Sequence, residues 1–307
     1  MQIVDAPIPT TLYVAGIPVT VLDEFRPERV KKFRHYRLGI QPLPWGTALV
    51  ARMPRRADPI FLSRLAAEYA VLEDLVHPAL PHVFAEVDDG HSLRGFVTEE
   101  LVFPSSGRWE RLYDGGLTLE TFLVHAEELC EGLAWLHARG RTHGDVTLGN
   151  TAFRPGHEEG DWTAVLADLE WSGRLNEPAH SLSTGNYVFT PAYASLEQIH
   201  GLPITPAAEV AALAVTLLSV LTGVEGYAAR SVKKSIENAG QPCLPREMWN
   251  RLHALPIPAD LKVLLCRARY PDVTRRPKDA LEFLHLLERI RALCPMDELA
   301  RPIPIPL

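Results

Sequence analysis

The chain contains 307 residues, of which 47% are hydrophobic and 22% are charged. Such a chain can bury a sizeable core, and the composition excludes an intrinsically disordered protein. The formal net charge of −7 and the pI of about 6.0 give no reason to expect a nucleic-acid-binding groove.

We expect a cytoplasmic protein that does not enter a membrane. The longest apolar run, residues 210–221, is too short to span a bilayer. The N-terminus lacks the basic and then apolar pattern of a signal peptide. The four cysteines are widely spaced and form no C-x-x-C pair, which predicts free thiols.

The first hundred residues favour strands. Alternating polarity over residues 11–25, around Gly16 and Pro18, predicts a hairpin, and residues 48–52 fit a strand. Residues 83–87 and 95–98 predict two more strands, joined by a turn at residues 88–90.

Helical periodicity interrupts this pattern once. Apolar residues recur at three- and four-residue steps from 61 to 75, which predicts a helix that ends at His77-Pro78. Residues 26–37 are basic and fit either a helix or a strand.

The rest of the chain is mostly helical. Residues 164–168 read as a short buried strand that ends in a carboxylate, and residues 301–307 fit an extended, polyproline-like tail. The sequence therefore predicts an α+β protein with a small strand-rich N-terminal part and a larger helical C-terminal part.

Residues 136–150 contain the most informative motif. A helix ends near Gly140, and Asp145 is followed five residues later by Asn150. A second carboxylate, Asp168, ends the strand that begins at residue 164. Two acids and an amide at neighbouring loop and strand ends are what a metal–phosphate site needs.

This arrangement resembles the protein kinase superfamily, whose pattern is H-R-D-x-x-x-x-N followed by D-F-G. The chain offers His143-Gly144-Asp145 with Asn150, and then Asp168-Leu169-Glu170. The run from Thr190 to Gln198 is similar to the G-T-P-x-Y-x-S-P-E-Q segment of bacterial Ser/Thr kinases.

The resemblance implies a bilobal protein kinase-like fold. The N-lobe would cover residues 1–98, with residues 1–25 as an extension atypical of the family. The hinge would lie at residues 99–101, with nucleotide in the cleft beneath it. A helical C-lobe would follow at 102–294, and a Pro-rich tail at 295–307.

The resemblance also implies roles for individual residues. Asp145 would be the catalytic base, Thr190 would contact it and favour Ser/Thr-type hydroxyl substrates, and Asn150 and Asp168 would hold Mg²⁺. ATP and Mg²⁺ would be the cofactors, and the partner a protein substrate or a regulated protein. The residues assigned to nucleotide binding are Thr98, as the gatekeeper, Glu99, Leu101 and Gly46.

Two further carboxylates match structural positions of the family. Glu197 would form a buried pair with Arg276, the late arginine of the pattern. Glu209 stands in the place of the aspartate that braces the catalytic loop.

The chain departs from the family in its phosphate-binding parts. Glu68 matches the glutamate of helix C, but Arg52 stands where the strand lysine belongs. In a second alignment, residues 46–52 form the second strand and the lysine strand is nearly deleted. Residues 39–46 hold two glycines with two prolines between them, and prolines lack the N–H groups that cradle phosphate. Gly144 replaces the arginine that reads a phosphate on the activation loop, so phosphorylation is not expected to be the switch.

Three functions fit these features. The first is an atypical ATP-dependent Ser/Thr protein kinase. The second is a pseudokinase, a binding or scaffold module with weak or no nucleotide turnover, which Arg52 and the prolines favour. The third is a small-molecule phosphotransferase, which the His-Gly-Asp triplet favours and the run from Thr190 to Gln198 opposes.

Overall fold

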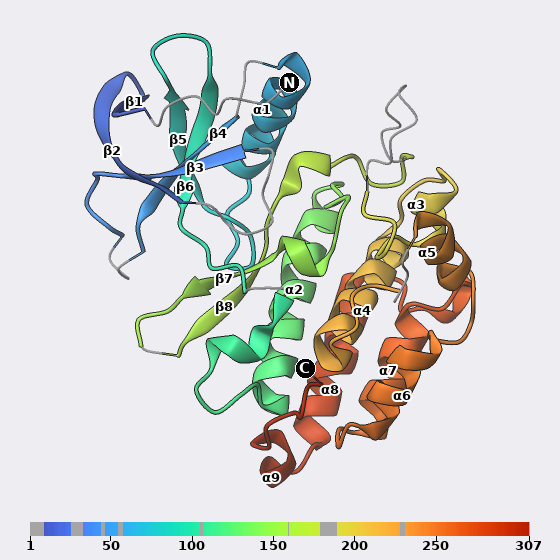
Figure 1. The fold of residues 1–307 in the computed structure, drawn as a ribbon. Coiled ribbons are helices and arrows are strands. Elements are labelled where there is room, and N and C mark those ends of the chain that lie inside the picture. Colours follow the sequence, from blue (N-terminus) through green and yellow to red (C-terminus); the bar gives the residue numbers. More distant parts are fainter. Residues whose placement is uncertain are drawn as a thin grey trace. The chain divides into compact units, whose positions relative to one another are not determined.

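The computed structural model describes residues 9–25, 33–43, 47–54, 58–104, 107–158, 160–178, 189–227 and 231–306. The chain divides into two compact units, the first formed by residues 1–102 and 154–162 and the second by residues 103–153 and 163–307. The described chain is thus a mixed α/β protein with a strand-rich N-terminal part and a helical C-terminal part (Figure 1).

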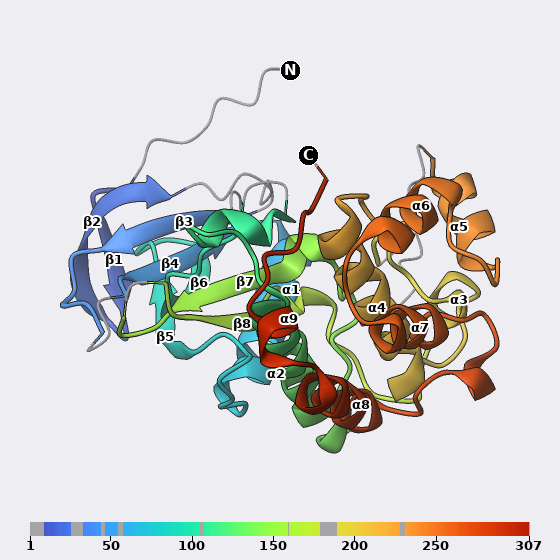
Figure 2. The same cartoon turned by 90° about the horizontal axis from the view of Figure 1, so that it is seen from below.

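Antiparallel strands of the first unit close into a small barrel. The strand order is β1-β2-β3-β4-β6-β5, and β1 closes it by pairing with β5 as well as with β2. Figure 2 shows the same strands from a second side. The strands are β1 (Thr11–Val14), β2 (Ile17–Phe25), β3 (Phe33–Leu38), β4 (Leu49–Pro54), β5 (Val83–Asp88) and β6 (Arg94–Glu99).

A tight turn and an apolar interior favour the barrel. Ala15 and Gly16 have φ values of 48° and 78°, which suit the two central positions of a tight hairpin turn, so the predicted hairpin of residues 11–25 is confirmed. Apolar side chains that point inward from neighbouring strands fill the interior: Leu12, Tyr36, Leu38, Leu49, Ala51, Met53, Val87 and Val97. Helix α1 (Pro59–Glu73), also predicted, packs against β4, β5 and β6.

The barrel resolves two points that the sequence left open. Residues 33–38 of the ambiguous basic stretch form β3, whereas residues 26–32 lie outside the described chain. The alignment that made residues 46–52 a second strand is wrong, because β4 is preceded by β1, β2 and β3 and leads directly to α1. Residues 11–14, 17–25 and 33–38 therefore supply barrel strands.

Helices dominate the second unit. Helix α4 is buried along almost its whole length, because it is apolar on all faces and packs against α6, α7 and α8. The helices are α2 (Leu119–Ala138), α3 (Leu196–Ile199), α4 (Pro206–Thr222), α5 (Val232–Ala239), α6 (Arg246–Ala254), α7 (Ala259–Ala268), α8 (Ala280–Leu293) and α9 (Met296–Leu299). Single 3₁₀ turns occur at Trp109–Leu112, Leu148–Asn150, Leu169–Trp171 and Val273–Arg275.

A two-stranded hairpin, β7 (Thr151–Pro155) and β8 (Trp162–Leu166), carries the two expected metal ligands, an amide and a carboxylate, at its open end. Asn150 immediately precedes β7, and Asp168 follows β8 by two residues. The sequence predicted β8 but not β7. The hairpin brings the two ends together, since the Ala167 N–H donates to the Asn150 carbonyl at 2.8 Å.

The C-terminal residues do not form only an extended tail. Residues 296–299 form helix α9, where acidic residues in the first turn favour the helix. The chain then runs beside the start of α2, where the Ile303 N–H donates to Leu117 and the Leu119 N–H donates to Arg301. The Ile303 side chain is buried, so the tail is part of the helical unit.

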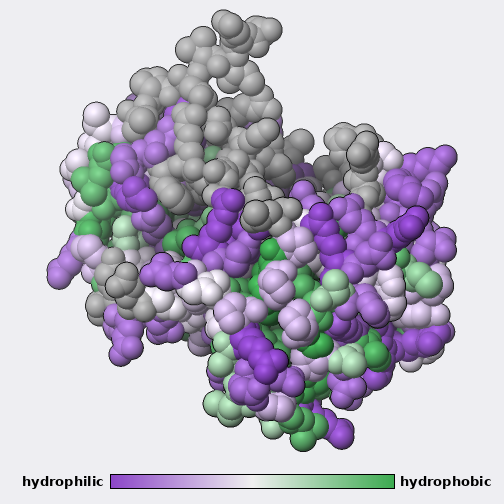
Figure 3. Space-filling model, turned by 60° about the horizontal axis from the view of Figure 1, so that its bottom comes forward, coloured by the Kyte–Doolittle hydropathy of each residue, from purple (hydrophilic) through white to green (hydrophobic). Residues whose placement is uncertain are grey.

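Hydrophilic residues cover much of the face drawn in Figure 3, with apolar areas between them. Within the described ranges, no helix is both long enough and apolar enough to cross a membrane.

A buried ion pair fixes the end of β6. The Glu99 side chain has no exposed surface and accepts from Arg154 of β7 at Nε (2.7 Å) and Nη2 (2.5 Å). Arg154 also donates to the carbonyls of Pro78 and Leu80, and the His82 N–H donates to Glu99 at 2.9 Å. One arginine thus joins β6, β7 and the connection from α1 to β5.

We predict that Arg154→Met lowers the free energy of unfolding by about 3–5 kcal/mol, because it leaves the buried Glu99 carboxylate without its cation. Urea unfolding monitored by circular dichroism measures the change. The matched control is Glu247→Gln, which breaks the exposed Arg251–Glu247 pair and should cost less than about 1 kcal/mol. Equal losses in the two variants would contradict the assignment.

Candidate functional site

One buried carboxylate on α4 fixes the loop of residues 142–150 through hydrogen bonds. Glu209 of α4 accepts from the backbone N–H groups of His143 (3.1 Å) and Gly144 (2.7 Å) and from Nε2 of His137 (2.9 Å). Burial acts to raise the pKa of Glu209, but the hydrogen bonds and the charge of His137 outweigh it and lower the pKa. Glu209 therefore stays ionised, and the prediction that it braces this loop is confirmed.

Gly144 has a conformation and surroundings that exclude a side chain. Its φ is +88°, and a Cβ placed on it would lie 2.2 Å from the carbonyl oxygen of Trp171. Its own carbonyl accepts from Nε2 of Gln198 at 2.9 Å. The close approach of Trp171 explains why this position cannot carry the arginine of the H-R-D pattern.

His143 is a structural residue of the loop. Its ring is buried, with Nε2 3.1 Å from the Ala167 carbonyl and Nδ1 3.3 Å from the Asp145 backbone nitrogen. These contacts fit a neutral ring that donates from Nε2 and accepts at Nδ1. Burial lowers the pKa of His143, which agrees with that form.

Thr190 and Asn150 converge on the carboxylate of Asp145. The Thr190 N–H donates to Oδ1 at 2.8 Å, and the Thr190 hydroxyl donates to Oδ2 at 3.1 Å. Nδ2 of Asn150 donates to the backbone carbonyl of Asp145 at 2.9 Å and to Oδ2 at 3.2 Å. The structure thus brings together three of the residues that the sequence singled out.

Asp168 lies close enough to influence Asp145. The pKa of Asp145 is raised to about 6. Burial raises it most and the negative charge of Asp168 adds to the rise, whereas hydrogen bonds from Thr190 and Asn150 oppose it. Asp168 itself has φ 66° and ψ 67°, a left-handed conformation uncommon outside glycine, asparagine and aspartate. Two acids near one another in a partly buried site favour a cation there.

In the first unit, Arg52 and Glu68 form the ion pair that the family resemblance implies. Nη1 of Arg52 lies 2.7 Å from Oε1 of Glu68, and both side chains are largely buried. The guanidinium also lies over the ring of Phe33, 4.4 Å from its centre, and 6.0 Å from that of Phe96. A planar guanidinium can stack on such rings in a way that a lysine ammonium cannot.

The residues predicted to bind nucleotide lie at the end of β6, with one exception. The Thr98 hydroxyl donates to the His82 carbonyl at 2.8 Å, Glu99 is paired with Arg154, and Leu101 is buried. Gly46 lies outside the described residues. The carboxylate of Glu99 is thus occupied by protein groups.

Two residues of the molecule were missed at the sequence level. Arg154 was not singled out, because a lone arginine in an unpredicted strand carries no sequence signal. Gln198 was noted only as part of a motif, yet it connects the segment that begins at Thr190 to the Gly144 carbonyl. A Ser three residues before a Gln is the signature of a capping box, and the Ser195–Gln198 box is present.

The predicted pair of Glu197 and Arg276 is confirmed. Nη1 of Arg276 lies 3.1 Å from Oε2 of Glu197, and Arg276 also donates to the carbonyls of Tyr270, Pro271 and Ala207. This pair anchors α3 to the connection between α7 and α8.

Comparison with known proteins adds to this geometry. No family model matches the chain. The chain is 28% identical over 246 residues to the serine/threonine-protein kinase PkaB of Streptomyces coelicolor, and the match covers 78% of this chain and 55% of that protein. A second relative from S. coelicolor, the serine/threonine-protein kinase PkaA, is 28% identical over 54% of this chain and 30% of its own length.

A third relative, the serine/threonine-protein kinase drp72 of Corynebacterium efficiens, is 27% identical over 75% of this chain and 43% of its own length. The similarities support a kinase-like protein. The chain spans about half, or less, of the length of these relatives.

We predict that Gly144→Ala costs at least about 2 kcal/mol of stability, because the new methyl group would lie against the Trp171 carbonyl at a positive φ. The matched control is Gly140→Ala. Gly140 also has a positive φ (67°) but no heavy atom within 4 Å of an added Cβ, so its loss should be about 1 kcal/mol. Thermal unfolding of both variants measures the difference. Equal losses would show that backbone strain alone decides the effect.

We predict that the stability of Asp145→Asn relative to wild type rises with pH between about 4 and 6. The pKa of Asp145 is raised from 3.8 to about 6, so the folded state binds its proton more tightly than the unfolded state. Wild-type stability therefore falls as the pH rises from about 4 to about 6, by roughly 2–3 kcal/mol at most. The amide of the variant does not titrate, so the stability of the variant relative to wild type should rise across this window and then level off.

Urea unfolding of wild type and Asp145→Asn at several pH values tests this sign. Asp114→Asn, at an exposed position, is the control that should show no such pH-dependent difference. A variant that loses stability relative to wild type as the pH rises would contradict the raised pKa.

Proposed function

We propose that the chain is a Ser/Thr-type protein kinase-like phosphotransferase that moves the γ-phosphoryl group of ATP to a protein hydroxyl with Mg²⁺. The observation that carries the proposal is the convergence of Thr190 and Asn150 on the Asp145 carboxylate. The similarity to bacterial serine/threonine kinases supports it.

Asp145 is the proposed catalytic base. Its Oδ2 already accepts a hydrogen bond from the hydroxyl of Thr190, so a hydroxyl fits within hydrogen-bonding distance of this oxygen. A substrate serine or threonine hydroxyl would take an equivalent place and lose its proton to the carboxylate. A pKa of about 6 leaves Asp145 mostly ionised near neutral pH and basic enough to orient or accept that proton.

Asn150 and Asp168 are the proposed Mg²⁺ ligands. Asn150 directs its amide nitrogen to Asp145, which leaves the amide oxygen Oδ1 for the metal. In the described part of the chain, no group of three or more His, Cys, Asp or Glu side chains could hold a metal. One carboxylate and one amide nevertheless fit Mg²⁺, which retains waters and completes its shell with nucleotide phosphates. When bound, Mg²⁺ would neutralise charge on those phosphates.

Five residues of the first unit are the proposed contacts of the nucleotide. Thr98 would face the adenine, and Glu99 and Leu101 would contact it through backbone atoms, because the Glu99 carboxylate is paired with Arg154. Arg52, held by Glu68, would supply the positive charge that the resemblance assigns to a strand lysine. Gly46 is proposed from the sequence alone.

A pseudokinase that binds a regulated protein partner is the second candidate. The stacking of Arg52 on Phe33 favours it, since those contacts hold the guanidinium as a structural part of the barrel. In that case the residues assigned to nucleotide binding would hold a nucleotide weakly or not at all.

We predict that the purified chain transfers phosphate from Mg·ATP to a protein acceptor, and that Asp145→Asn and Asp168→Asn each lower the rate by at least about 100-fold. Radiolabelled ATP with a general Ser/Thr acceptor protein measures the transfer, and Asp114→Asn is the control. Equal trace phosphorylation by wild type and both variants would contradict the enzyme and favour the pseudokinase.

Thermal shift with ATP, with and without Mg²⁺, tests binding separately from turnover. A ligand that binds the folded state raises the melting temperature by mass action. A shift that needs Mg²⁺ and is lost in Asp168→Asn supports the metal assignment even where turnover is slow.

A further inference from the structure

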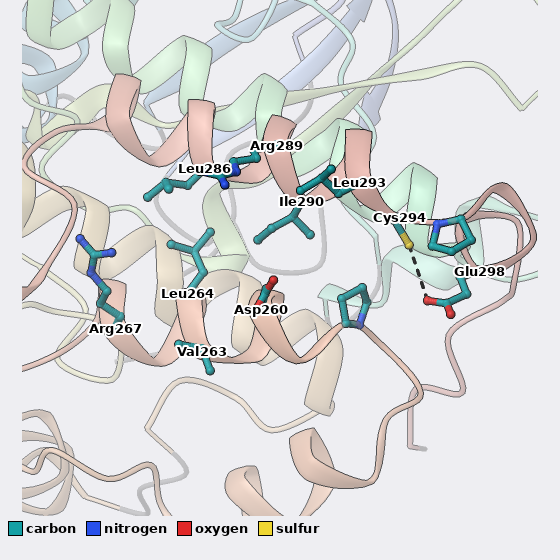
Figure 4. A pocket seen from close by; sticks show the side chains of 12 residues that line it. Asp260, Val263, Leu264, Arg267, Leu286, Arg289, Ile290, Leu293, Cys294 and Glu298 are labelled. Carbon is teal, nitrogen blue, oxygen red and sulfur yellow. Dashed lines mark hydrogen bonds between the residues drawn. The ribbon is translucent and has the colours of Figure 1, made fainter.

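A groove in the second unit lies between α7 and α8, with the start of α9 at one end (Figure 4). Its volume is about 360 Å³. Each helix contributes a stripe with the spacing i, i+3, i+4, i+7, which places four side chains on one helix face. The stripes are Asp260, Val263, Leu264 and Arg267 on α7, and Leu286, Arg289, Ile290 and Leu293 on α8.

The groove presents large apolar side chains to solvent. Val263 is 64% exposed and Leu293 is 73% exposed, and Met296 of α9, next to the lining residues, is 74% exposed. Apolar side chains on a surface are ordinary when scattered, but Val263, Leu264, Leu286, Ile290 and Leu293 line one groove together and form an apolar strip between the charged residues. Covering that strip with another apolar surface would remove it from water and favour association.

Four charged residues line the groove: Asp260, Arg267, Arg289 and Glu298. Of these, Asp260 and Arg289 are two opposite border charges placed in a self-complementary way. Asp260 of α7 and Arg289 of α8 lie on opposite walls, both near the middle of the groove (Figure 4). A two-fold axis that runs along the groove turns a second copy over and exchanges the two walls. Helix α7 of each copy then lies over α8 of the other, and Arg289 of each copy faces Asp260 of the other.

We infer that this groove is the interface of a symmetric homodimer. An isologous contact of this kind buries the apolar strip of both copies and forms the charge pair twice. An amphipathic ligand with one charge, such as a fatty acid, would pair with only one of the two border charges, whereas a second copy pairs with both. The inference does not depend on the proposed phosphotransfer, because none of these residues belongs to the site around Asp145.

The dimer is expected to be weak. A stable interface usually buries about 1,200–2,000 Å². The charged residues beside the apolar strip must also lose water when two copies associate, which reduces the net gain. Dissociation constants in the micromolar range or weaker, which rise with ionic strength, therefore fit the proposal.

Sedimentation velocity of the full chain over a concentration series tests the inference. Wild type should dimerise reversibly, and Leu293→Asp should raise the dissociation constant at least about tenfold, because it places a carboxylate in the apolar strip. Leu281→Asp is the matched control, since Leu281 is 50% exposed on the same helix but does not line the groove. It should dimerise like wild type.

A charge exchange tests the two-fold arrangement itself. Arg289→Glu alone and Asp260→Lys alone should each weaken self-association at least about tenfold, because like charges then face one another twice. An equimolar mixture of the two variants should dimerise like wild type, since each mixed dimer again has two opposite-charge pairs. Both side chains are exposed, so both variants should stay folded. Asp260→Lys should lose a little stability, because Asp260 lies in the first turn of α7 where a negative charge is favourable.

Three outcomes would overturn the inference. They are a wild type that stays monomeric at every concentration, a dimer that Leu293→Asp does not weaken, and a mixture of the charge variants that does not associate. Restoration in the mixture, with both single variants folded and monomeric, would establish the interface.

Discussion

The oxygens of one ionised carboxylate, Glu209, determine the path of the loop that carries the candidate site. Its three N–H donors come from two different segments, the end of α2 and the loop at residues 143–144. A buried carboxylate must be compensated by such donors, and backbone N–H groups in a loop must find acceptors. Here the N–H groups compensate the carboxylate, and the carboxylate gives the N–H groups their acceptor. Helix α4, which is buried along almost its whole length, supplies the rigid support.

Further hydrogen bonds connect this loop to the segments that carry the two candidate acids. Gly144 turns the backbone so that its N–H meets Glu209 and its carbonyl meets Gln198. His143 joins the loop to the carbonyl of Ala167, one residue before Asp168. The positions of Asp145 and Asp168 are thus linked through His143, and the electrostatic effect of one acid on the other follows from that proximity. Because each acid raises the cost of ionising its neighbour, a site that keeps the two close together is suited to a bound cation.

The sequence was sufficient for the parts whose patterns are local. The hairpin of residues 11–25, helix α1, strands β5 and β6, and the pairing of Glu197 with Arg276 were predicted and are confirmed. The closure of the barrel could not be predicted from the sequence. The pairing of β1 with β5 joins residues more than seventy positions apart and depends on neither turn chemistry nor periodicity. Strand β7 and its Arg154 were missed for a similar reason, since a five-residue strand is too short for its polarity pattern to be distinctive. The tail was assigned from its prolines, and the helix-favouring acids at residues 297–298 were overlooked.

The contacts of Arg52 add to what its position in the sequence indicates. The resemblance assigns Arg52 to the position of a lysine, and the contact of Arg52 with Glu68 is the ion pair that this assignment implies. Its stacking on Phe33 is a contact that a lysine could not make equally well, so the barrel has adapted to the larger, planar group. An arginine fixed on both sides loses little further entropy by staying in place, yet it is also less able to move toward a phosphate.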